Sequence, residues 1–446
     1  MPGSGFEAVI GLEIHAQLLT ASKIFCGCST AFGAEPNTHI CPVCLGLPGA
    51  LPVLNRAAVD YAIRAALALG CAVQERSIFA RKNYFYPDLP KGYQISQYEL
   101  PLALGGVVAA NSDDWAPGYD IRITRIHMEE DAGKLLHEGF LDSDRRSYVD
   151  LNRAGTPLIE IVTEPDFREA KHAAAFFGYL RELLVAIGVN DGNMEEGSLR
   201  CDANVSVRKP GDPLGTKAEI KNLNSFRFLV NAINHEIARQ IELRERGERV
   251  VQETRLWDPA AERTVSMRSK EEAHDYRYFP EPDLPPLDVP PARIDAVRAT
   301  LPELPAAWRR RLIAAHQLTA TDAVMLTQVR PGLGRYFEAA VRAGADAKAA
   351  KNWVLGIISA KMNELGSDDA EALAANVPAA NLAALLMLVE KGAISGSMAK
   401  DVFEKMHTSG QTADAIVAAE GLAQIDDESQ IAGLIAGVLA ANAGPV

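Results

Sequence analysis

Six prolines between residues 280 and 291 divide this 446-residue chain into two parts with different hydrophobic periodicities. Before them, apolar and polar residues alternate in several short stretches, which is the pattern of half-buried strands. After them, only helical stripes occur, such as the one from Leu382 to Val389. A chain of this length accommodates two or three domains. The sequence therefore predicts an α+β domain over residues 1–293 and an all-helical region over residues 294–446.

The composition is that of a soluble globular protein, with 48% hydrophobic and 23% charged residues. The chain has no run of eighteen apolar residues and begins without a signal or transit peptide, so we expect a cytoplasmic protein with no membrane partner. A net charge of −13 argues against broad non-specific binding of nucleic acids, although one RNA could still bind a local patch. Six cysteines in so long a chain do not indicate a secreted disulfide scaffold.

Residues 121–134 combine a strand pattern with a group of acids. The apolar positions change phase between Ile123 and Ile126, which predicts a bulge. If the strand continues, Glu129 and Glu130 point to opposite faces. Consecutive carboxylates at this point have two interpretations, a charged strand end entering a turn or a set of oxygen ligands for Mg²⁺.

Residues 9–18 predict a half-buried strand in which Glu13 and His15 project from the same face, roughly 6–7 Å apart. This face could simply be solvated. A glutamate beside a histidine could instead bind a metal or act as a general base.

Four cysteines form two close pairs, Cys26 with Cys28 and Cys41 with Cys44. Two pairs of thiolates at this spacing fit a tetrahedral structural zinc site, and two reduced, buried pairs are the alternative. No open ligand position is implied, so we expect such a zinc ion to stabilise the loop rather than to act in catalysis.

Residues 81–94 mix basic and aromatic residues around two prolines, and Lys82 and Lys91 belong to this stretch. Such residues could stack on nucleic-acid bases. The prolines favour a rigid loop that forms the wall of a pocket.

Further strands are predicted at residues 158–163, at 200–207 with Asp202 on the polar face, and at 217–221 with Glu219 between two lysines. Helices are predicted at residues 55–69, 168–187 and 226–245. No P-loop and no GxGxxG sequence occurs, so a nucleotide site would have to be built on a sheet with metal ions. The acids and cations of the predicted strands fit such a site for Mg²⁺ and ATP.

Several motifs together resemble one family, the B subunits of tRNA-dependent amidotransferases (GatB). The resemblance extends from about residue 8 to the end of the chain. In addition to the four cysteines, it rests on the segments Gly11–His15, Tyr84–Asp88, His127–Asp131, Asn152–Glu160, Lys221–Phe226 and Met267–Pro280.

The resemblance implies a ligase that uses glutamine as its amide donor. Such a subunit uses ATP to phosphorylate the side chain of Glu mischarged on tRNA(Gln), or of Asp on tRNA(Asn). Ammonia from a GatA-type glutaminase subunit then displaces the phosphate, and a small GatC-type subunit completes the heterotrimer. The implied fold is an antiparallel-sheet cradle of the glutamine synthetase and guanido kinase type with a zinc-binding loop, followed by helices and a YqeY-like tail that contacts tRNA.

The resemblance also implies roles for individual residues. His15, Glu130 and Glu219 are expected to hold Mg²⁺, and Glu13, Glu129 and Asp202 to complete the catalytic group. Lys82, Lys91 and Glu130 are expected at the polar mouth of an ammonia channel. The expected cofactors are ATP, Mg²⁺ and a structural Zn²⁺.

One departure from the family concerns the tail, because the chain stops a few dozen residues short of the usual end, and we expect an incomplete tRNA-binding element. Two other functions also fit the residues. A stand-alone carboxylate–ammonia ligase would use the same acids with free ammonia, and a structural, zinc-bearing RNA-binding subunit would not need the acids at all.

Overall fold

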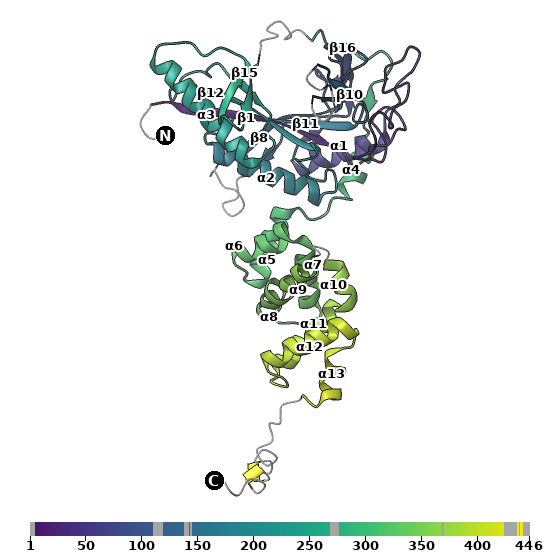
Figure 1. The fold of residues 1–446 in the computed structure, drawn as a ribbon, viewed down its shortest axis with the longest axis vertical. Helices are drawn as coiled ribbons and strands as arrows, with labels where there is room; N and C mark the ends of the chain where they lie inside the picture. Colours follow the sequence, from purple (N-terminus) through teal and green to yellow (C-terminus); the bar gives the residue numbers. More distant parts are fainter. Residues whose placement is uncertain are drawn as a thin grey trace. The chain divides into compact units, whose positions relative to one another are not determined.

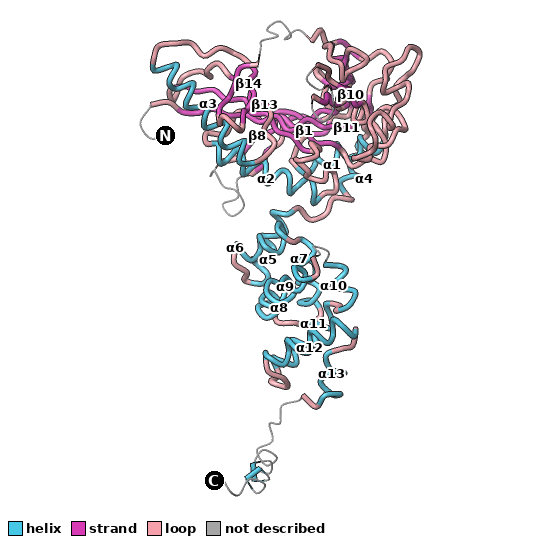
Figure 2. Tube along the Cα trace, in the orientation of Figure 1, coloured by secondary structure: helices cyan, strands magenta, loops and turns pink. Residues whose placement is uncertain are grey.

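The structure is a computed structural model that describes residues 5–109, 119–137, 142, 145–267, 276–366, 370–422, 435–436 and 438–439. The chain forms two compact units, Met1–Leu304 and Pro305–Val446. All described strands lie in the first unit, and the second is helical (Figure 1 and Figure 2). The protein is therefore of mixed α and β structure, with a large sheet followed by a helical region, as predicted. The end of the predicted tail, residues 440–446, lies outside the described residues.

The main sheet of the first unit has ten strands. They are β1 (Glu7–Gln17), β2 (Ala72–Val73), β6 (Ala103–Leu104), β7 (Val107–Val108), β8 (Ile121–Glu130), β11 (Pro157–Thr163), β12 (Leu199–Arg208), β13 (Ala218–Lys221), β14 (Thr254–Asp258) and β15 (Arg263–Ser266). Their order is β15-β14-β13-β12-β1-β11-β8-β6-β2, and β7 pairs with β8. All neighbours are antiparallel except β13 and β14, which are parallel. The strands predicted for residues 9–18, 158–163, 200–207 and 217–221 are all present.

The bulge predicted in β8 is confirmed by its register with β11. Val162 faces Arg125 and Thr163 faces Ile123, so Thr124 is an additional residue on β8. The bulge allows Ile123 and Ile126 to be buried on the same side although they are three residues apart.

Helices cover the apolar face of the main sheet. They are α1 (Arg56–Ala68), α2 (Ala170–Ala186), α3 (Phe226–Glu245) and α4 (Pro291–Arg298). Figure 1 shows α2 and α3 along one side of β1 and β12. Leu12 and Ile14 of β1 are fully buried in this core, whereas Glu13 and His15 point to the opposite face. The predicted helices are thus confirmed, and they leave the polar face of the sheet free for a site.

The first unit extends to Leu304 because α4 packs against α1. Arg293 of α4 forms an ion pair with Asp60 of α1 at 2.8 Å, and Val297 is buried in the same core. The prolines therefore lead into a helix that still belongs to the first unit.

Shorter strands form three small sheets. They are β3 (Arg76–Ser77) with β17 (Leu287–Asp288), β9 (Lys134–Leu136) with β10 (Tyr148–Asp150), and β4 (Phe79–Asn83) between β5 (Tyr93–Gln97) and β16 (Phe279–Pro280). The β4–β5 hairpin corrects the prediction of a loop over residues 81–94, because only residues 84–92 connect the two strands. Consecutive polar residues in β4 (Arg81, Lys82 and Asn83) mask the strand pattern there.

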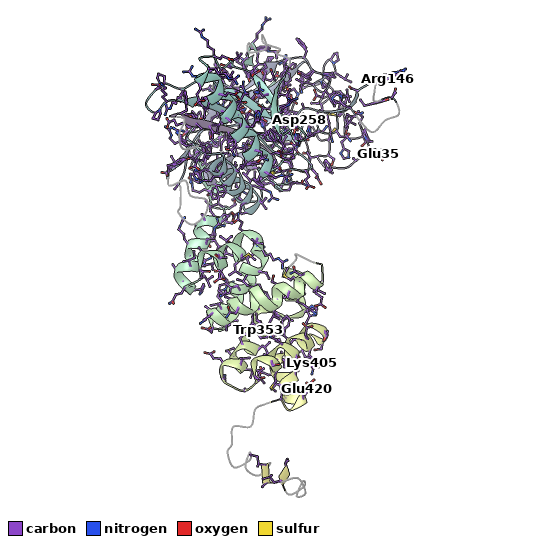
Figure 3. The ribbon with its side chains drawn as sticks, turned by 60° about the vertical axis from the view of Figure 1, so that its left-hand side comes forward. Glu35, Arg146, Asp258, Trp353, Lys405 and Glu420 are labelled. Atoms are coloured by element: carbon purple, nitrogen blue, oxygen red, sulfur yellow. The ribbon has the colours of Figure 1, made fainter. Side chains whose placement is uncertain are left out.

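The second unit is built from nine α-helices and two π-helical turns within the described residues. These are α5 (Pro305–His316), α6 (Ala320–Val324), η1 (Met325–Val329), α7 (Pro331–Arg342), α8 (Ala347–Trp353), η2 (Val354–Ile358), α9 (Ser359–Glu364), α10 (Ala370–Asn376), α11 (Ala379–Glu390), α12 (Gly396–Ser409) and α13 (Ala413–Glu420). Trp353 packs edge-on against Phe403, and Lys405 pairs with Glu420 (Figure 3). No described helix has the length and hydrophobicity needed to cross a membrane.

Candidate active site

The polar face of the main sheet carries a row of four charged or titratable side chains at its centre. His15 on β1 faces Arg200 on β12 and Glu160 on β11, and Glu160 faces His127 on β8. Residues that pair across strands point to the same face, so the register brings these four side chains together.

Two carboxylates and two imidazoles from this row and the next form a tight cluster. The Nε2 atom of His15 lies 3.4 Å from Glu160 and 3.9 Å from Glu129. The Nε2 atom of His127 lies 3.3 Å and 3.7 Å from the same two carboxylates. His127, Glu129 and Glu160 are buried, and His15 is partly exposed at the edge. We call these four residues the histidine–glutamate cluster.

Electrostatic attraction between the two histidines and the two glutamates sets the protonation states of this cluster. Burial opposes the charged form of His127, but Glu160 and Glu129 outweigh it and raise its pKa to about 9. Burial likewise opposes ionisation of Glu160, but His127 and His15 hold its pKa well below the usual value. Two ionised carboxylates are thus stabilised at neutral pH by positive charge placed between them.

A divalent cation fits this cluster in place of the imidazolium charge. Ligand atoms of His15, Glu129 and Glu160 all lie within 4.8 Å of one another, so one ion can contact all three. Two carboxylates and an imidazole suit Mg²⁺ or Mn²⁺. His127 Nδ1 is buried without a hydrogen-bond partner.

A second acidic group lies on the same face toward β13. Glu13 faces Asp202 across β1 and β12 and accepts a hydrogen bond of 2.9 Å from Asn204. Lys221 pairs with Asp202 at 2.9 Å and with Glu219 at 3.0 Å. Burial and neighbouring carboxylates raise the pKa of Glu13. Five of the six predicted catalytic residues, all except Glu130, thus share the polar face.

Glu130 leaves β8 on the opposite side from Glu129. Its Oε1 atom accepts hydrogen bonds from the Lys91 ammonium at 2.5 Å and from the Ile95 backbone amide at 2.9 Å. The predicted metal set of His15, Glu130 and Glu219 is therefore not the group that the contacts assemble. The structure instead favours Glu129 and Glu160 as the partners of His15.

Lys82 lies on β4, where it faces Gln94 of β5. Its ammonium lies 4.9 Å from the ring centroid of Tyr276 and 5.9 Å from that of Tyr84. Burial opposes its charge, but Glu129, Glu160 and two neighbouring tyrosines together outweigh burial and raise the pKa of Lys82. Lys82 thus lies on the side of Glu129, and Lys91 lies on the opposite side of β8 with Glu130.

The residue that sequence reasoning missed is Glu160. It lies inside the apolar strand 157–163 and inside a motif of the family, but only the pairing of β11 with β1 and β8 reveals its position. For His127, the alternation of the strand predicts no more than a face shared with Glu129. An isolated acid within an otherwise apolar strand was the available signal, because burying such a charge requires a partner.

The four predicted zinc ligands come together. Sulfur atoms of Cys26, Cys28, Cys41 and Cys44 all lie within 4.8 Å of one another, and all four cysteines are free. Cys41 Sγ and Cys44 Sγ are 3.8 Å apart, close to the edge of about 3.8 Å in a tetrahedron with Zn–S bonds of about 2.3 Å. We call these residues the four-cysteine cluster.

A buried ion pair lies near the end of β8. Asp131 accepts hydrogen bonds of 3.0 Å from both terminal nitrogens of Arg200, and Arg153 lies 3.7 Å away. Burial opposes ionisation of Asp131, but the two arginines outweigh it and hold its pKa at about 2. Asp131 also pairs through its backbone with Gly155 and Thr156, and these contacts together with Arg153 anchor the turn at residues 151–156 to the end of β8.

In a comparison with known proteins, most of the chain matches one family. Residues 8–295 match the GatB/GatE catalytic domain, and residues 335–446 match the GatB domain. Curated relatives, each named as the B subunit of an aspartyl/glutamyl-tRNA(Asn/Gln) amidotransferase, are similar over nearly their whole length. The one from Anaeromyxobacter dehalogenans strain 2CP-C is 57% identical over all of this chain and 92% of its own, and the one from Geobacter sulfurreducens is 55% identical over 99% and 91%. With its acidic sheet face and its four-cysteine cluster, this chain belongs to the GatB/GatE family.

Proposed function

We propose that this chain is the subunit of a tRNA-dependent amidotransferase that activates the mischarged amino acid with ATP. The substrate is Glu on tRNA(Gln), Asp on tRNA(Asn), or both. The side-chain carboxylate attacks the γ-phosphorus of ATP, ADP leaves, and ammonia then displaces phosphate to form the amide. The histidine–glutamate cluster, in a chain of this family, is the observation that carries the proposal.

The cluster supports this chemistry through charge. His15, Glu129 and Glu160 would hold Mg²⁺, which when bound screens the negative charges of the phosphates and of the attacking carboxylate. Glu13, Asp202 and Glu219 form a second group of oxygen ligands on the same face, beside Lys221. The largely antiparallel sheet with helices on one face and acids on the other is consistent with the expected cradle of the glutamine synthetase type.

Ammonia delivery is proposed to involve Lys82, Lys91 and Glu130. Lys91 and Glu130 form a buried ion pair on the opposite side of β8 from Glu129, whereas Lys82 lies on the side of Glu129. A polar route from Lys91 and Glu130 would therefore pass around the end of β8 to reach Lys82 and the histidine–glutamate cluster. A polar lining would guide neutral ammonia while the surrounding aromatic rings keep water away from the activated carboxylate.

The remaining roles concern structure and assembly. The four-cysteine cluster would hold a structural Zn²⁺, because four thiolates leave no ligand position for a substrate. We infer that a glutaminase subunit of the GatA type and a small GatC-type subunit complete the enzyme, and that the second unit contacts tRNA.

The test is amidation by the reconstituted three-subunit complex, with Glu-tRNA(Gln) and Asp-tRNA(Asn) offered separately and either glutamine or ammonium as nitrogen donor. We expect ADP formation that requires a mischarged tRNA and amidation with both donors. ADP formation without tRNA, or amidation by this chain alone with ammonium, would instead indicate a stand-alone ligase. No ATP hydrolysis under any condition would indicate a structural subunit.

A further inference from the structure

Lys23 is a completely buried cation, with an exposed fraction of 0%. Its ammonium donates hydrogen bonds to two backbone carbonyls, those of His39 at 2.7 Å and Leu151 at 3.3 Å. Among the residues that the structure describes, no carboxylate forms an ion pair with Lys23. Lysines are almost never fully buried unless paired, because a charge without a counter-charge is unfavourable in the interior.

The side chain of Lys23 runs beside the four-cysteine cluster. Its backbone amide donates to the carbonyl of Cys28 at 3.0 Å. A Cβ atom at Gly155 would lie 3.5 Å from Lys23 Cδ and 3.7 Å from Cys44 Cβ, so the aliphatic part of Lys23 and Cys44 border the same small space. The side chain that carries the positive charge thus borders the four-cysteine cluster, and its ammonium binds the carbonyl of His39, two residues before Cys41.

The acids of the polar face and Glu130 do not need Lys23, since each group of them has its own cation. His15 and His127 lie against Glu129 and Glu160, Lys91 pairs with Glu130, and Lys221 pairs with Asp202 and Glu219.

We propose that Lys23 supplies the counter-charge for the metal-bound four-cysteine cluster, an inference that rests on the zinc site proposed above. Four thiolates around Zn²⁺ carry a net charge of −2, and a buried ammonium next to them compensates half of it. The attraction is mutual, because the thiolates provide the negative charge that Lys23 otherwise lacks. Lys23 is a positioning residue here and contacts no reacting atom.

The position of Lys23 also links the metal to the polar face. Leu151, which accepts one of its hydrogen bonds, begins the turn that contains Arg153, and Arg153 contacts Asp131 at the end of β8. Loss of the metal would leave the Lys23 ammonium uncompensated at the base of this turn.

The experiment measures zinc affinity by competition with a chromophoric chelator in the complete three-subunit complex. Lys23→Met has nearly the same shape without the charge, and we expect it to weaken zinc binding at least tenfold and to speed zinc release, as loss of a supporting contact around a metal does. Lys171→Met, which removes a lysine that is 68% exposed, should leave the competition curve unchanged. A Lys23→Met curve that coincides with the wild-type curve would overturn the proposal for Lys23 while leaving the zinc site intact, whereas wild-type protein without zinc would overturn both.

Lys23→Gln, whose amide can still donate to the His39 carbonyl, replaces Lys23→Met if the latter does not fold. If neither folds, the same substitutions are made in a chain with Cys26→Ser and Cys28→Ser. Better folding of Lys23→Met in that background than in the wild-type background supports the coupling of charge and thiolates. Equal failure in both backgrounds shows that Lys23 acts by packing alone and refutes the proposal.

Discussion

The two clusters of the first unit differ in what supports them. The histidine–glutamate cluster is built on three neighbouring strands, and its positions follow from the register of β1, β11 and β8. The four-cysteine cluster lies on a connection with no α-helix and little strand structure between β1 and α1. A sheet can hold charges in place without a metal, whereas a loop of this kind needs cross-links. The first cluster should therefore matter for chemistry and the second for stability.

A few contacts nevertheless lead from the four-cysteine cluster to Glu130, the neighbour of Glu129 on β8. Gly46, two residues after Cys44, has a φ angle of +65°, and a Cβ there would lie 2.3 Å from Lys91 Cγ. Lys91 in turn binds Glu130. Substitutions in each cluster, and between them, test how far their roles can be separated.

The largest effect is expected for Glu160→Gln, which keeps the shape of the side chain and removes one charge from the histidine–glutamate cluster. Phosphoryl transfer depends on charge neutralisation and positioning, so amidation should fall by about a thousandfold, roughly 4 kcal/mol of barrier. Amidation of Glu-tRNA is measured with glutamine and with ammonium, and neither should restore the rate. Basal glutamine hydrolysis serves as the control. Rescue by ammonium would show that Glu160 acts in ammonia delivery.

Cys26→Ser should lower the stability of the protein and leave its chemistry largely unchanged. Losing one of four thiolates weakens the metal and removes a cross-link, so we expect a loss of about 3 kcal/mol in the free energy of unfolding. Metal analysis of the wild-type protein should give about one zinc per chain, and that of the variant less. The rate per folded molecule should change little. A severe loss of rate in a stable, folded variant would contradict the separation of the two clusters.

Asp131→Asn tests the ion pair between the clusters. The pKa of Asp131 is lower in the folded state than in the unfolded chain, so it stabilises the protein above pH 4, and this contribution is lost as the pH falls toward 2. We expect the variant to be less stable than the wild type by about 2 kcal/mol at pH 7, with a difference that shrinks at acid pH. Urea unfolding at several pH values measures this. A difference that does not change with pH would show that packing, not charge, stabilises this site.

The smallest effect is expected for Lys91→Met. If Lys91 lines the ammonia route, glutamine-dependent amidation should fall about tenfold, and external ammonium should restore most of the rate. The ratio of the two rates is the measurement, and Lys134→Met, which changes an exposed lysine at the start of β9, is the matched control. A loss that persists with ammonium would place Lys91 among the groups that serve phosphoryl transfer.

Local patterns in the sequence were enough to predict much of the fold. Alternation in residues 9–18 and 200–207, and the stripe of residues 226–245, correspond to β1, β12 and α3, because the burial of one face imposes a fixed period on a strand or helix. The phase change between Ile123 and Ile126 predicted the bulge in β8 for the same reason. The two cysteine pairs indicated their convergence directly, since a short loop leaves few other arrangements.

What only the tertiary structure decided is the grouping of side chains from different strands. Glu129 and Glu130 look equivalent in the sequence, but one joins His15 and the other binds Lys91, because neighbouring residues of a strand point to opposite faces. Glu160 joins His15 and His127 because β11 lies between β1 and β8 in the sheet. The sequence by itself determined the alternation of apolar and polar side chains within the strands and helices that it predicted. Strand order and register, which depend on contacts between distant segments, determine which of them meet.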